Sequence, residues 1–92
     1  MIEAQVELQI DAPKGKQSAI AVMNFACGPI PSDEFFVGTH PEEGVMVQVT
    51  HRYFDEAGAL HLNTEEIQLD DAAMEFLVKA GWHIEPDEGH ES

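Results

Sequence analysis

The chain contains five histidines, side chains that could ligate a metal or move protons. His51 and His61 fall in two segments that read as facing strands, but the preferred register points them to opposite faces of that hairpin. A second group combines His with carboxylates, ligands that suit several divalent metals, and it surrounds Pro86 and Gly89 near the C-terminus: His83, Glu85, Asp87 and His90. The register and the polar, Pro/Gly-containing end both argue against a preformed site, so the sequence predicts no metal site.

Cys27 is the single cysteine and the obvious candidate nucleophile. No histidine is fixed beside it by the sequence, and free cysteine is among the residue types most often buried. The chain contains no Gly-x-Ser-x-Gly motif, no phosphate-binding glycine loop and no paired-cysteine zinc spacing. We therefore predict a buried structural Cys27, no catalytic residue and no cofactor, which means a non-enzymatic protein.

Charge is the property that most strongly limits the function. The 92 residues include 18 Asp and Glu against 4 Lys and Arg, a formal net charge of −14. Such a field disfavours direct binding to nucleic acid or anionic membranes and favours a basic protein or nucleoprotein complex as partner. The charge is concentrated in residues 53–92, where eleven acids accompany one base.

The stretch NTEEIQLDDAAME, residues 63–75, carries five of these acids and no Lys or Arg. Asp70 is a good helix N-cap and Asp71 suits the first turn of a helix. Glu65 and Glu66 have no such local role, and the preceding turn adds two more acids. With two adjacent aromatic residues as apolar anchors, the predicted partner-binding residues are Asp55, Glu56, Glu65, Glu66, Asp70, Asp71, Phe35 and Phe36.

Hydrophobic periodicity predicts the elements that must position these side chains. Strict alternation over residues 2–10 is typical of a strand with one wet face, and residues 18–27, 45–54 and 59–63 read as three further strands. Residues 28–44, with three prolines and three glycines, read as a long loop. Leu69, Ala73, Phe76, Leu77 and Ala80 recur at helical spacing, and Gly81 ends that helix.

The expected fold is therefore α+β: a four-stranded, mainly antiparallel sheet of two hairpins, with one C-terminal helix packed on one face. Residues 1–85 would form one domain and residues 86–92 a flexible acidic tail. In the second hairpin, a four-residue loop would pair Tyr53 with Leu60 and His51 with Leu62, because that register buries one consistent face.

The N-terminal segment MIEAQVELQI alternates and carries acids where a signal peptide has bases. No apolar run approaches the roughly 20 residues that span a bilayer. Together with the single cysteine, these features predict a cytoplasmic protein without membrane partners.

In size, charge and architecture, with the acids at 55, 56, 65, 66, 70 and 71, the chain resembles the small phage-borne inhibitors of bacterial defence, which include anti-CRISPR proteins and DNA mimics. The resemblance implies a stoichiometric inhibitor, acting in the host cytoplasm if phage-encoded, that covers a basic nucleic-acid-binding surface of a host complex. Three alternatives stay open at this point. They are an immunity or antitoxin-like protein, a metal-dependent enzyme, and a structural module that forms a homodimer through the doubly apolar segment 18–27.

Overall fold

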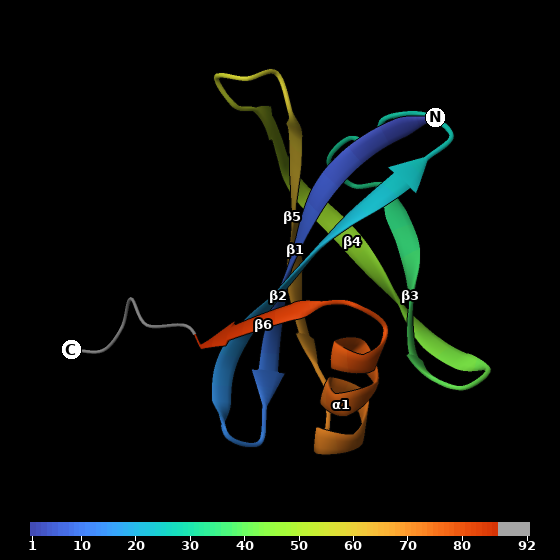
Figure 1. Cartoon of the computed structure of the whole chain (residues 1–92), viewed down its shortest axis with the longest axis vertical. Coiled ribbons are helices and arrows are strands. Elements are labelled where there is room, and N and C mark those ends of the chain that lie inside the picture. The colour runs from blue at the N-terminus through green and yellow to red at the C-terminus, as the bar shows by residue number, and fades with distance from the viewer. Residues whose placement is uncertain (87–92) are drawn as a thin grey trace.

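The computed structural model describes residues 1–86, which form six strands and one short helix (Figure 1). In chain order these are β1 (Ile2–Ala12), β2 (Gly15–Phe25), β3 (Glu34–His40), β4 (Glu43–Phe54), β5 (Leu60–Gln68), α1 (Asp71–Lys79) and β6 (His83–Pro86). All six strands belong to one sheet in the order β3-β4-β5-β1-β2-β6. The sheet curls into a half-barrel, and α1 lies near its lower opening in Figure 1.

The predicted α+β fold with a four-stranded, mainly antiparallel sheet is wrong. The protein is mostly β, and its sheet is mixed because β1 pairs in parallel with β5 while every other neighbouring pair is antiparallel. This parallel seam joins the β1–β2 hairpin to the β3–β4–β5 meander. Local sequence patterns report strand character but not which distant strands pair, and that is why the seam was missed.

Strand β3 lies where a long loop was predicted, at residues 28–44. The prolines that suggested a loop fall outside the strand, since Pro31 precedes β3 and Pro41 lies in the turn after it. Within β3 the side chains alternate, with Val37 and Thr39 buried on the inner face. Gly38 is tolerated inside the strand, where it pairs with Gly44 of β4.

The predicted register of the β4–β5 hairpin is also wrong. Tyr53 pairs with His61 and Arg52 with Leu62, one residue away from the expected partners. A bulge between Val49 and His51 inserts an extra residue, so the buried valines of β4 still share the inner face with the leucines of β5. The same bulge turns His51 outward and brings Arg52 to the inner face.

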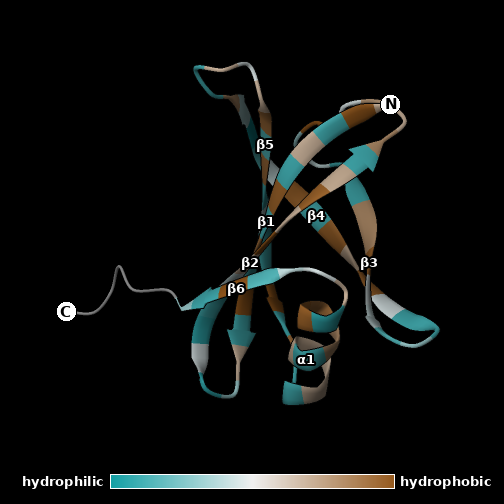
Figure 2. Ribbon diagram, in the orientation of Figure 1, coloured by the Kyte–Doolittle hydropathy of each residue, from teal (hydrophilic) through white to brown (hydrophobic). Residues whose placement is uncertain are grey.

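The core fills the inner face of the curled sheet. Alternate residues of β1 are buried there, and Val6, Leu8, Val47, Leu62 and Leu77 are fully inaccessible. Figure 2 shows the resulting alternation of hydrophobic and hydrophilic residues along the strands. The predicted half-buried first strand is confirmed, because its odd-numbered residues from Glu3 to Asp11 face outward while its even-numbered ones from Ala4 to Ala12 are buried.

Helix α1 has the ends that the sequence predicts. The Asp70 carboxylate accepts a hydrogen bond from the Ala73 N–H at 2.8 Å, which is N-cap geometry. At the other end Gly81 has φ 107°, its N–H bonds to the Val78 carbonyl, and the Trp82 N–H bonds to the Leu77 carbonyl. These two bonds form a Schellman motif, and the chain then turns into β6, which pairs with β2.

No helix among residues 1–86 combines the length and the apolar character needed to cross a membrane. Of the predicted tail at residues 86–92, Pro86 ends β6 and residues 87–92 lie outside the described residues.

Candidate protein-binding surface

The six acidic candidates are spread along β5 instead of forming one patch. Asp55 and Glu56 lie in the turn before β5, Glu65 and Glu66 lie within it, and Asp70 and Asp71 begin α1 just after it. The nine residues of β5, at about 3.3 Å each, separate the two ends of this series by roughly 30 Å. In Figure 1 the β4–β5 turn is at the top of the molecule and α1 at the bottom.

Asp55 is held by contacts within its own hairpin. One carboxylate oxygen accepts the N–H groups of Ala57 and Ala59 at 2.9 and 3.0 Å, and the other lies 2.8 Å from Nε2 of His61. The hydrogen bond from His61, followed by those from the backbone, lowers the pKa of Asp55 below its ordinary value of 3.8. This carboxylate therefore closes the turn, while its neighbour Glu56 is exposed.

Glu66 forms an ion pair with a lysine from another strand. Its carboxylate lies 2.6 Å from Nζ of Lys16, which is fifty residues away in sequence. Both side chains are about half exposed, so this pair contributes little to stability. Glu65 is exposed at the point where the pairing of β5 with β1 shifts register.

Asp55 and Glu66 share the outer face of the sheet. The partner of Asp55, His61, pairs with Gln5, and Glu66 pairs with Gln9. Gln5 and Gln9 alternate with the buried residues of β1, which places both pairs on the outer side.

Asp70 and Asp71 serve the helix and its surroundings. Besides capping α1, Asp70 lies 3.8 Å from Nε2 of His40 at the end of β3, and the other ring nitrogen of His40 lies 3.8 Å from Glu43. His40 therefore stands between two carboxylates and links the start of α1 to the β3–β4 turn. Asp71 lies in the first turn of α1, where the helix dipole favours it.

The two adjacent phenylalanines have different environments. Phe35 faces inward, is partly buried against the core and makes an edge-to-face contact with Phe25, with ring centroids 5.4 Å apart. Phe36 faces outward, is 58% exposed and pairs with Met46, which is 51% exposed. Of the two predicted anchors, only Phe36 is available to a partner.

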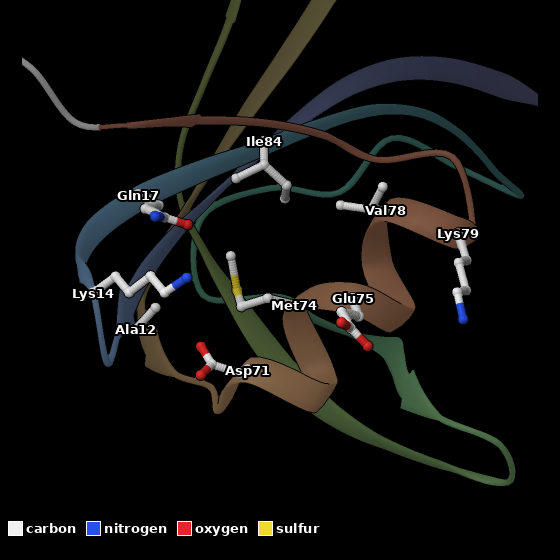
Figure 3. Close-up of a pocket in the computed structure, with 9 residues that line it drawn as sticks. All are labelled: Ala12, Lys14, Gln17, Asp71, Met74, Glu75, Val78, Lys79 and Ile84. Atoms are coloured by element: carbon white, nitrogen blue, oxygen red, sulfur yellow. The ribbon is translucent and has the colours of Figure 1, made fainter.

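A pocket of about 540 Å³ lies between α1, the β1–β2 hairpin and β6 (Figure 3). Met74, Val78 and Ile84 supply much of its apolar wall. Two lysines and two acids also line it: Lys14, Lys79, Asp71 and Glu75. These formal charges cancel, and in Figure 3 Lys79 points away from the other lining side chains.

No group of three or more His, Cys, Asp or Glu side chains within residues 1–86 is arranged to hold a metal ion. His51 and His61 both face outward but pair with different residues, Asn63 and Tyr53. His83 and Glu85 lie 3.2 Å apart, and the other two members of that predicted group, Asp87 and His90, lie outside the described residues. Cys27 is exposed, not buried as predicted.

Sequence reasoning named Phe35 and Phe36 of β3 but missed the acids that surround this strand and the outward Met46. Asp33 and Glu34 lie at the start of this strand, and Glu42 and Glu43 lie at the turn that follows it. They are the only charged residues of the Asp, Glu, Lys and Arg types between Lys16 and Arg52. That absence of Lys and Arg is a signal in the sequence, and so is the outward position of Met46 among alternating valines.

Comparison of the chain with protein-family models, with curated protein sequences and with solved structures found no match. The class of protein is therefore defined by the structure alone: an acidic, mostly β protein with a curled six-stranded mixed sheet and one short helix.

Proposed function

We propose that this chain is a non-enzymatic, acidic protein-binding inhibitor that covers a basic nucleic-acid-binding surface of a partner protein or nucleoprotein complex. The observation that carries the proposal is the excess of acid. If each of the 4 Lys and Arg residues neutralised one carboxylate, 18 − 4 = 14 acids would still lack a Lys or Arg. Three histidines lie within 4 Å of acids, but they add full positive charge only when protonated.

The size of this charge suits a nucleic-acid surrogate. Duplex DNA carries one charge per roughly 1.7 Å of axis, so fourteen charges correspond to about 24 Å of duplex. The acidic series beside β5 extends over roughly 30 Å at the strand rise of about 3.3 Å per residue. The molecule itself measures 38 × 33 × 22 Å, so it can present such a length to a groove built for a short duplex.

In the proposed mechanism, carboxylates such as Glu56 and Glu65 occupy positions that phosphates take on the natural ligand. Lys and Arg side chains of the partner engage them, and the long-range field accelerates encounter. Inhibition follows because the covered surface no longer binds nucleic acid. An exposed apolar side chain, Phe36, adds a contact that salt does not screen.

The test is capture of partners on the immobilised chain from a bacterial lysate at low ionic strength. Elution is by a salt gradient in one arm and by duplex DNA in the other. We expect basic nucleic-acid-binding proteins to be retained, and both salt and duplex DNA to release them. A matched variant with Glu56→Gln and Glu65→Gln, which keeps side-chain shape, should release them at lower salt.

Two results would contradict the proposal: no retained protein at low salt, or retention that neither salt nor duplex DNA changes. Retention of a basic toxin that salt releases and duplex DNA does not would instead support the antitoxin-like alternative.

A further inference from the structure

Strand β3 has an open edge. It is one of the two terminal strands of the sheet order, the other being β6, so within residues 1–86 only β4 is hydrogen-bonded to it as a neighbouring strand. Edge strands usually carry Lys, Pro or a bulge that discourages further pairing. The segment EFFV, residues 34–37, has neither Lys nor Pro, and the irregularity in pairing begins only after Gly38.

Hydrogen-bonded and non-hydrogen-bonded pairs alternate between β3 and β4, and this alternation shows which backbone groups of β3 point to the open edge. The Val49 N–H donates to the Asp33 carbonyl at 2.8 Å, which makes this a hydrogen-bonded position. Bonding positions alternate along an antiparallel pair, so Phe35 and Val37 bond to β4. The N–H and C=O groups of Glu34 and Phe36 therefore point to the open edge.

An apolar platform lies beside this edge on the outer face. Phe36 and Met46 form a non-hydrogen-bonded pair, the position where cross-strand side chains approach most closely. The Phe36 ring lies over Gly44, where a Cβ atom would fall within 2.6 Å of two ring carbons. The Phe36 ring therefore packs against the β4 backbone, while 58% of the Phe36 surface stays exposed.

Acids flank the platform at both ends of the strand. Asp33 and Glu34 precede Phe36, and Glu42 and Glu43 occupy the following turn. Asp33 accepts the Ile30 N–H and Glu43 lies 3.8 Å from His40, whereas Glu34 and Glu42 are exposed. At the far end α1 approaches β3, with the Phe76 ring beside Gly38, so the accessible edge is limited to residues 34–37.

We propose that this edge binds an extended, basic segment of the partner as a seventh strand, with an aliphatic side chain over Phe36 and Met46 and Lys or Arg facing Glu34. The proposal rests on the proposed function, because it names the partner chemistry that the acidic surface would recognise. Strand addition gives affinity through main-chain hydrogen bonds and specificity through alternate side chains. The expected recognition pattern is therefore a cation two residues from an aliphatic residue on one face of the added strand.

The probe is the labelled peptide Thr-Lys-Thr-Val-Thr-Lys-Thr, with its Thr-Glu-Thr-Val-Thr-Glu-Thr counterpart as the charge control. Amide hydrogen exchange of the complex, followed by NMR, reads the geometry directly. We expect the amides of Glu34 and Phe36 to become protected when the basic peptide binds. The amides of Phe35 and Val37 should be protected with or without peptide, and the acidic peptide should protect none of the four further.

Variants then separate the contributions, with affinity measured by fluorescence anisotropy. Glu34→Pro removes an outward N–H at the first position of the strand, where proline is tolerated. The basic peptide should then no longer protect the amide of Phe36. Phe36→Thr should weaken binding about tenfold, as the loss of an apolar anchor does. Glu34→Gln should weaken it about threefold, the scale of an exposed ion pair. The matched controls are Val22→Thr, an exposed apolar residue of β2, and Glu3→Gln, an exposed acid of β1, and neither should change binding.

The edge proposal is overturned if the basic peptide binds without protecting Glu34 and Phe36, or if Val22→Thr weakens binding as much as Phe36→Thr. It is also overturned if the peptide does not bind. Failure of the proposed function is distinguishable, because there the immobilised chain would retain no salt-sensitive partner at all. If the Glu34→Pro variant retained a partner as strongly as the parent chain, the edge proposal would be wrong. The proposed charge-based inhibition would still stand.

Discussion

The imidazole of His61 stacks on the phenol ring of Tyr53, with ring centroids 4.8 Å apart and 5° between the two planes. The two residues are directly opposite each other on β5 and β4. The stack fixes the ring so that Nε2 donates to Asp55 at 2.8 Å. A cross-strand aromatic pair and a turn carboxylate thus close the same hairpin from its outer face.

The first prediction concerns the pKa of Asp55. Changing His61→Ala removes the largest cause of the shift, so the pKa of Asp55 should rise toward 3.8 while staying below it, because the backbone bonds remain. In the parent chain the folded pKa is depressed, so Asp55 contributes stability above pH 3.8 that is lost as pH falls through the folded value. Carboxyl-carbon NMR titration measures this directly. The carboxylate of Glu56 is the control, and an unchanged Asp55 curve would contradict the assignment.

The second prediction concerns the N-cap of α1. Asp70→Ala leaves the Ala73 N–H without its side-chain acceptor and should lower the free energy of unfolding by about 1 kcal/mol. Asp71→Ala removes only a favourable interaction with the helix dipole, about 0.3–1 kcal/mol. Urea unfolding of both variants gives the comparison. If Asp71→Ala were the more damaging change, Asp70 would not be the functional cap.

The third prediction separates the two faces of α1. Leu77 is fully buried, so Leu77→Ala should cost about 2–5 kcal/mol of unfolding free energy, including the cavity it leaves. The neighbouring Val78 is 55% exposed in the pocket wall, and Val78→Ala should cost no more than about 0.5 kcal/mol. Thermal unfolding by circular dichroism distinguishes them. Similar losses for both would mean that α1 packs on a different face.

The fourth prediction concerns Gly44. A Cβ at this position would clash with the Phe36 ring and with the Val37 carbonyl oxygen. Gly44→Ala should therefore destabilise the protein by about 1–3 kcal/mol through overpacking. Adding Phe36→Ala should give little recovery, because the backbone contact remains. Full recovery in chemical denaturation would show that the ring alone requires glycine. Gly58→Ala has nothing within 4 Å but a φ of +87°, and so reports conformational strain without a clash.

Features set by neighbouring residues could be predicted from the sequence. Three such features are the hydrophobic alternation of β1, the N-cap of α1 at Asp70 and the end of α1 at Gly81. Each depends on a few consecutive positions, and all three predictions are confirmed. Strand β3 was missed because Pro31, Gly38 and Pro41 read as loop signals, although two of them lie outside the strand and Gly38 is accommodated opposite Gly44.

Features set by distant residues could not be predicted. The pairing of β1 with β5 and the contact of Lys16 with Glu66 join positions about fifty residues apart. The bulge near His51 shifted the register of β4 on β5, and no local pattern marks it. For the candidate site, the sequence supplied the acids but not their distribution along β5, and it could not choose between Phe35 and Phe36.

The parallel seam between β1 and β5 also bears on how the chain folds. Ala4 lies opposite Leu60, so the two partners are 60 − 4 = 56 positions apart. The β1–β2 hairpin turns within a few residues and can form while synthesis continues. The other neighbour of β1 in the sheet is β5, which is not available for pairing until it has left the ribosome. Such non-local pairing slows folding because loop closure precedes the contacts that stabilise it. The nascent chain therefore carries a half-finished sheet, with one edge of β1 open, until β5 (residues 60–68) has emerged, although β1 supplies five residues of the core.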